Sequence, residues 1–95
     1  MRARLLHRFK LVDAGGLEER VAWEVPVSRK YPQGIRYRLV FVRAGEKRPA
    51  VLYDNHHPKG HHRHVGGRQE PYPFEGFERL LEDFRKHVEQ LKWKH

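Results

Sequence analysis

The sequence predicts an α+β domain in which a four- to five-stranded antiparallel β-meander carries one C-terminal α-helix packed on one face. Two observations support this fold class. Apolar and polar residues alternate through most of residues 1–53, and short turns join the alternating segments. From residue 75 onward, apolar residues recur at intervals of three and four, which is typical of an amphipathic helix. We expect residues 1–95 to form one domain.

Four segments of the first half are predicted to be strands. Residues 3–12 and 17–25 flank a turn with paired glycines, which supply positive φ at no steric cost. Residues 35–42 show the clearest alternation, and residues 49–53 add a short fourth strand that completes the meander.

The basic side chains of these strands are predicted to gather on one face. In the first strand, Leu5, Phe9 and Leu11 would share the packed face. In the second strand, Val21 and Trp23 are likewise assigned to packing. A basic strand face can meet a phosphate backbone while the apolar face packs. The residues that we expect to bind nucleic acid are Arg4, Arg8, Lys10, Arg36 and Arg38.

The second half divides into a long loop and the helix. Residues 54–73 have no periodicity and are punctuated by glycine and proline, so we predict a functional loop there. Part of this loop, around His62 and His64, can add a fifth short strand. The helix is predicted over residues 75–92, with a buried apolar stripe formed by Phe77, Leu80, Leu81, Phe84, Val88 and Leu91.

Charge and composition narrow the partners of this chain. The net charge is +8, and residues 1–53 alone hold 12 basic against 5 acidic side chains. Such a field attracts a polyanion, which predicts RNA or DNA as a partner, although an acidic protein segment would also fit. The absence of cysteine excludes disulfides and thiolate chemistry. No apolar run is long enough for a signal peptide or a membrane span, so we expect a cytoplasmic protein without membrane contact.

Five of the eight histidines fall within residues 56–64, the most informative stretch of the sequence. Imidazole titrates near neutral pH, so it can serve as base or acid in metal-independent RNA cleavage. In an extended chain, His62 and His64 point the same way, about 6.6 Å apart, and Arg63 faces the other side unless a bulge turns it. The expected catalytic residues are His62 and His64 as acid and base, Lys59 and Arg63 as phosphate-stabilising cations, and Asp54 or Glu70 as orienting carboxylates.

The same histidines allow other interpretations. A metal site would combine the His-x-His pair with His57, His61 or Asp54, but the neighbouring cations disfavour a divalent ion. A solvated basic loop, with imidazoles bonded to backbone groups, is a structural alternative. A non-catalytic module that binds nucleic acid or a protein is another. We therefore expect a candidate endoribonuclease with no metal ligand and no cofactor.

Several motifs together resemble a known family. Tyr53-Asp54-Asn55 is followed by Lys59-Gly60-His61-His62-Arg63-His64, by Glu70-Pro71-Tyr72-Pro73-Phe74, and by Leu81, Asp83 and Phe84. In these motifs the chain is similar to the TumE-type toxins over nearly its whole length, most specifically at Lys-Gly-x-His-Arg-His. Many members of that family carry an acidic residue where this chain has His61. The resemblance therefore makes His61 the least secure member of any site.

The resemblance also implies a partner. It implies a toxin of a type II toxin–antitoxin system, which a helix-turn-helix antitoxin neutralises. RNA is the expected target by analogy with other small, basic, growth-arresting toxins. The short chain can build only a small core. The sequence is therefore also compatible with a homodimer, which would bury more apolar surface.

Overall fold

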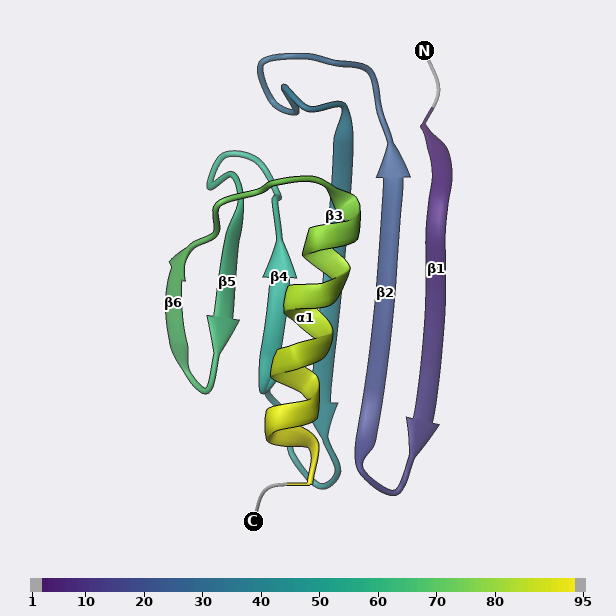
Figure 1. Ribbon diagram of the computed structural model, residues 1–95, viewed down its shortest axis with the longest axis vertical. Helices are drawn as coiled ribbons and strands as arrows, with labels where there is room; N and C mark the ends of the chain where they lie inside the picture. Colours follow the sequence, from purple (N-terminus) through teal and green to yellow (C-terminus); the bar gives the residue numbers. More distant parts are fainter. Residues whose placement is uncertain (1–2, 94–95) are drawn as a thin grey trace.

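Six strands follow one another in chain order across one antiparallel sheet, and a helix lies on it (Figure 1). This computed structural model describes residues 3–93, so both ends of the predicted domain lie just outside the described residues. The elements are β1 (Arg4–Asp13), β2 (Gly16–Glu24), β3 (Ile35–Arg43), β4 (Val51–Asp54), β5 (His62–Val65), β6 (Arg68–Pro71) and α1 (Phe77–Lys92). The predicted α+β meander with a C-terminal helix is confirmed, with six strands instead of four or five.

Two strands lie within residues 54–73, where we predicted a long loop with one short strand around His62 and His64. β5 is that strand, and β6 was not predicted. β5 and β6 form a hairpin whose turn residues, Gly66 and Gly67, both have positive φ, at 58° and 88°. Two consecutive positive φ values suit a tight two-residue hairpin turn, and glycine adopts them without strain. Each of these strands has only four residues, most of them polar. They are therefore too short to display a clear alternation in the sequence.

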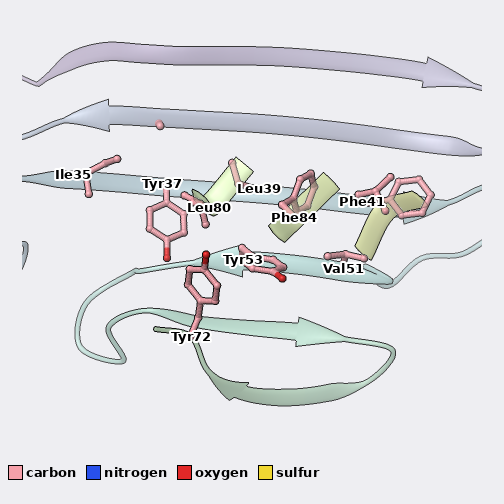
Figure 2. Packing of buried hydrophobic residues seen from close by; sticks show 11 residues of the cluster. Ile35, Tyr37, Leu39, Phe41, Val51, Tyr53, Tyr72, Leu80 and Phe84 are labelled. Carbon is pink, nitrogen blue, oxygen red and sulfur yellow. The ribbon is translucent and has the colours of Figure 1, made fainter. Parts of the chain in front are cut away.

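The helix packs on one face of the sheet, which we call the helix face, and lies across β3 and β4 (Figure 1). Figure 2 shows the core between them, where Leu80 and Phe84 of α1 join Leu39 and Phe41 of β3 and Tyr53 of β4. All five side chains are fully buried. Burial of each contributes about 1.5–3 kcal/mol relative to an exposed position. No helix in the described residues is both long enough and apolar enough to cross a membrane.

We call the opposite side of the sheet the open face, because no helix of the described chain covers it. Register and strand alternation place there Arg8, Lys10, Val21, Trp23, Arg36, Arg38, Val40, Asp54, His62 and His64. Most of these residues are polar or charged, which fits a face that remains in contact with solvent.

The start of β1 departs from its predicted facing. The register with β2 shifts between Leu5 and His7, which is a β-bulge. Leu5 therefore pairs with Trp23 on the open face, whereas Phe9 lies on the helix face. The prediction that Leu5 and Phe9 share a face is wrong, because the bulge inserts a residue that simple alternation does not count. Arg4 is moved to the helix face by the same bulge.

The apolar residues of β2 point away from the helix. Glu18 and Arg20 lie on the helix face instead, where their side chains form a 2.7 Å ion pair and are only 8% and 13% exposed. The Arg20 guanidinium also lies 4.0 Å from the centre of the Phe9 ring, which adds a cation–π contact. Val21 and Trp23, which we assigned to packing against the core, lie on the open face.

Asn55 fastens the end of β4 to β3. Its side chain is buried, its Oδ1 accepts a hydrogen bond from the Tyr37 N–H at 2.9 Å, and its Nδ2 donates to the Ile35 carbonyl oxygen at 2.7 Å. The amide thus replaces the main-chain ladder beyond the last residue of the strand. Asp54, its neighbour in the chain, is held in place by this anchor.

Replacing Asn55 with Ala should destabilise the fold by about 2–4 kcal/mol, because two buried main-chain groups lose their partner. Urea denaturation followed by circular dichroism would record a lower midpoint at an unchanged slope. Ser28→Ala is a suitable control, since Ser28 accepts its hydrogen bond from Tyr31 at an exposed site. Equal midpoints for the two variants would contradict the anchoring role.

Candidate active site

Charged groups of three neighbouring strands line up on the open face. Asp54 of β4 lies between Arg38 of β3 and His62 of β5 in the register of the sheet. His64 lies on the same face as His62, with ring centres 5.5 Å apart and ring planes at 69°. We call Arg38, Asp54, His62 and His64 the histidine site.

The His62 ring is hydrogen-bonded at one nitrogen and faces a carboxylate at the other. Its Nδ1 lies 2.8 Å from the Gly60 carbonyl oxygen, which can only accept, so Nδ1 carries a proton. Its Nε2 lies 3.5 Å from Asp54 Oδ1. The residue is only 8% exposed. The Nδ1 hydrogen bond and burial therefore fix the ring's orientation, with Nε2 directed toward Asp54.

Asp54 is fixed by the start of the β4–β5 loop. Its Oδ1 accepts a hydrogen bond from the His56 backbone N–H at 2.9 Å, which is an Asx-turn. A carboxylate that is itself held in place can orient a neighbouring imidazole, as in acid–base sites generally. Asp54 lies where it can orient the His62 imidazole in this way.

Two grooves on the open face border the histidine site at Arg38. The larger, of about 420 Å³, is lined by Val21, Trp23, Arg36, Tyr37, Arg38, Asp54 and His56. Its lining combines an indole, two guanidinium groups and a carboxylate. A second groove of about 300 Å³ is lined in part by Arg8 and Lys10. Val21 and Arg38 line both grooves, so the second groove continues the first toward β1.

The predicted nucleic-acid-binding residues divide between the faces. Those on the open face are Arg8, Lys10, Arg36 and Arg38, all of them exposed. Arg4 lies on the helix face, where its guanidinium pairs with the Glu24 carboxylate at 2.9 Å. The basic track beside the grooves is therefore made by four of the five residues.

Arg63 and Glu70 lie on the helix face, away from the histidine site. Their 3.1 Å ion pair links β5 to β6, and Arg63 also donates to the Tyr53 hydroxyl at 3.4 Å. The Tyr53 hydroxyl is in turn hydrogen-bonded to Nδ1 of His87 on α1. The structure thus separates Arg63 and Glu70 from the other expected catalytic residues and joins them to the helix.

Lys59 approaches the histidine site from the β4–β5 loop. It is exposed and lines a hollow of about 340 Å³ that also reaches His62 and Glu70. His56 and His57 of the same loop are exposed, and His56 lines the larger groove. The loop therefore surrounds one end of the histidine site with additional basic side chains.

His61 anchors the loop rather than facing the groove. Its ring stacks on Phe74 with centres 4.5 Å apart, and its Nδ1 lies 2.9 Å from the Tyr37 hydroxyl. Its Nε2 lies 3.0 Å from Gln33 Oε1, an acceptor, so Nε2 carries the proton and Nδ1 accepts from the tyrosine. Burial, helped by the nearby His62, lowers the pKa of His61. A neutral ring with both nitrogens engaged serves packing.

The histidine site brings together the groups of a phosphoryl-transfer site. Two imidazoles can accept and donate protons, Asp54 orients one of them, and Arg38 can stabilise negative charge on a phosphate. Within residues 3–93, no three histidine or carboxylate side chains are grouped so as to hold a metal ion. Two imidazoles and a carboxylate are side chains that can take part in general acid–base chemistry.

A family model described as toxin TumE matches residues 2–92, nearly the whole chain. The chain belongs to the TumE toxin family. No curated protein and no solved structure matches it. The resemblance seen in the motifs is thereby confirmed, and the protein is a toxin of a toxin–antitoxin system. A cognate antitoxin is therefore its partner.

Two features of this toxin's site were not predicted as such. Trp23 forms a wall of the larger groove, and Arg38 lies opposite Asp54. The sequence carries a signal for the first feature, because Trp23 and Arg36 each lie in a strand whose residues alternate between faces. That signal places them side by side only after the two strands are paired, since Trp23 then lies directly opposite Arg36.

The toxin should lose stability as the pH falls below about 6.5. Burial is the main cause that lowers the pKa of His7, His61 and His87. Near those pKa values the folded chain binds fewer protons than the unfolded chain. The contribution of these three rings to the free energy of unfolding is therefore fully present above about pH 6.5. It is lost as the pH drops through their lowered pKa values.

Urea denaturation at pH 7.5 and pH 5.5 would measure the difference in the free energy of unfolding. Both pH values lie above the range near pH 4 where carboxyl groups titrate. His87→Gln should reduce it, because one of the three neutral rings is removed. A free energy of unfolding that is equal at the two pH values would refute the prediction.

Proposed function

We propose that this toxin is a metal-independent endoribonuclease that binds single-stranded RNA along the open face and cleaves it at the histidine site. The observation that carries the proposal is the row of Arg38, Asp54 and His62 across three strands, with His64 beside it, at the end of a basic groove. Cytoplasmic RNA would be the substrate class. Two imidazoles, a carboxylate and a guanidinium are the groups that this reaction requires.

The reaction needs a base and an acid on either side of one phosphate. The base removes the 2′-OH proton, the 2′-oxygen attacks phosphorus, and the bond from phosphorus to the 5′-oxygen breaks. The acid protonates that 5′-oxygen, so the products are a 2′,3′-cyclic phosphate and a 5′-hydroxyl. We assign the base to His64, which is more exposed than His62. We assign the acid to His62, because both of its ring nitrogens face acceptors.

Arg38 takes the role that we first expected of Arg63. The Arg63 guanidinium is engaged by Glu70 and Tyr53 on the helix face. Arg38 is exposed on the open face and lies opposite Asp54. A guanidinium in this position stabilises the charge that develops on the phosphate, and Lys59 can add a second cation from the loop.

The larger groove suits a nucleotide next to the scissile phosphate. A base that stacks on Trp23 gains about 1–3 kcal/mol, whatever its sequence. Arg36 lies opposite Trp23 in the sheet, so its guanidinium can contact the phosphate of the stacked nucleotide. Aromatic side chains interleaved with arginine are typical of surfaces that bind single strands.

One observation favours a second function, which is RNA binding without cleavage. Only 8% of His62 is exposed, so RNA contacts this ring only if the RNA backbone enters beside His64. The same two grooves would then serve a toxin that blocks an RNA by occupying it. The two functions differ in their products.

Purified toxin should cleave single-stranded RNA in the presence of EDTA and leave 2′,3′-cyclic phosphate ends. His64→Ala should lower the rate by about 10²- to 10⁴-fold, the usual contribution of a general acid or base. Denaturing gels and mass spectrometry of the ends would measure both. An RNA with 2′-deoxynucleotides at the cleavage positions should resist cleavage, because the 2′-OH nucleophile is absent there.

Matched arginine variants separate the two faces in the same assay. Arg38→Gln should slow cleavage strongly, whereas Arg68→Gln, at an exposed residue of β6, should not. Equal degradation by wild type and His64→Ala would indicate a contaminant and sink the mechanism. RNA that is bound but never cut would support the second function.

RNA binding should quench the fluorescence of Trp23. The sequence has two tryptophans, so the Trp93→Phe variant leaves Trp23 as the single reporter. Titration of this variant, with His64→Ala added to prevent cleavage, should give a quench that weakens with rising salt. Arg36→Gln should weaken binding, and the control is Arg68→Gln. Quenching that is absent although RNA binds by gel shift would show that Trp23 is not the stacking platform.

A further inference from the structure

The two edges of the sheet differ in length and in protection. β6 forms one edge with only four residues and ends at Pro71, which cannot donate to a neighbouring strand. β1 forms the other edge with ten residues, and in Figure 1 no other element of the described chain lies beyond it. Alternate backbone N–H and C=O groups of β1 point outward, away from β2. Only one edge is therefore long enough to accept a further strand.

Exposed apolar side chains concentrate on the same strand. Six large apolar residues are exposed among the described residues, and four of them lie on β1: Leu5, Leu6, Leu11 and Val12. Leu11 is on the helix face, and Leu5 and Val12 are on the open face. Single exposed apolar residues are ordinary, but a concentration on an unpaired edge marks an interaction site. A strand laid along β1 would cover these side chains.

The charges of β1 decide what kind of strand fits. Arg8 and Lys10 are exposed on the open face. A second copy paired edge to edge, with its open face continuing this one, would place Arg8 against Arg8 or against Lys10 in the two central registers. Like charges directly opposite one another are destabilising. The same charges attract acidic side chains, so they disfavour a second copy and favour an acidic partner.

We propose that the cognate antitoxin docks on β1 and adds an extended segment as a seventh strand of the sheet. On the open face, the segment presents acidic side chains to Arg8 and Lys10. On the helix face, it presents apolar side chains to Phe9 and Leu11. Main-chain hydrogen bonds supply much of the affinity in this mode, and the alternating side chains supply the specificity.

The location of this strand gives a route to neutralisation, a step that rests on the proposed function. Arg8 and Lys10 line the smaller groove, which shares Arg38 with the groove beside the histidine site. Acidic side chains at that edge occupy the cations that RNA would need. The antitoxin then competes with RNA for the basic track without contacting His62 or His64.

Hydrogen exchange with mass spectrometry tests the docking site directly. The sample is the full-length toxin in complex with its cognate antitoxin, and the reference is the free toxin. Peptides that cover residues 4–13 should exchange at least about tenfold more slowly in the complex, because the outward amides gain partners. Peptides that cover residues 68–71 should not change. Protection of β6 or α1 with β1 unchanged would overturn the proposal.

Charge reversal gives an independent measurement. Lys10→Glu should weaken antitoxin binding by about tenfold or more, and the control Arg68→Glu, on the opposite edge, should not. Both variants are tested for folding by circular dichroism. Equal affinities of the two folded variants would overturn the charge argument. Protection of residues 4–13 in free toxin, rising with its concentration, would identify a second copy as the occupant and overturn the assignment to the antitoxin.

The docking result does not depend on catalysis. If the toxin cleaves no RNA but β1 is protected in the complex, the proposed function fails and the docking site stands. If RNA is cleaved and β1 exchanges freely in the complex, the docking site fails and the proposed function stands.

Discussion

The position of Tyr53 in the core determines the face of the sheet on which the histidine site lies. Its ring is fully buried beneath the helix, in contact with Tyr72 and Phe84. Because side chains alternate along a strand, Asp54 must then point to the open face. A slip of one residue would bury the carboxylate and expose the tyrosine, so the register of β4 is strongly specified. Asn55 closes this arrangement by bonding to the backbone of β3.

The same alternation gives the histidines of one short stretch different roles. His62 and His64 lie on the open face, where their nitrogens can serve a ligand. His61 bonds to Tyr37 on the other side of the sheet, as His87 of α1, outside this stretch, bonds to Tyr53, and burial lowers the pKa of both rings. A count of histidines cannot separate these groups. Their difference comes from the face on which each ring lies, and therefore from the tertiary structure.

Much of the fold, but less of the site, was predictable from the sequence. The helix and the long strands followed from strong periodicity, which local sequence expresses directly. The β1 bulge and the buried Glu18–Arg20 pair break that periodicity, and so the facing of Leu5 and Trp23 was misassigned. The engagement of Arg63 by Glu70 depends on the β5–β6 hairpin, whose strands are too short to show a pattern. Contacts of this kind appear only when strands are paired.

The β4–β5 loop has a consequence for how a ligand would be received. Asn55 ties the start of the loop to β3, and His61 ties its end to Tyr37 and Gln33. Gly60, between these anchors, holds the His62 ring through its carbonyl oxygen. A segment pinned at both ends loses little further conformational entropy when a ligand binds, so the site is preorganised. Folding itself has already placed the imidazole, and a ligand would find the groups in position rather than draw them together.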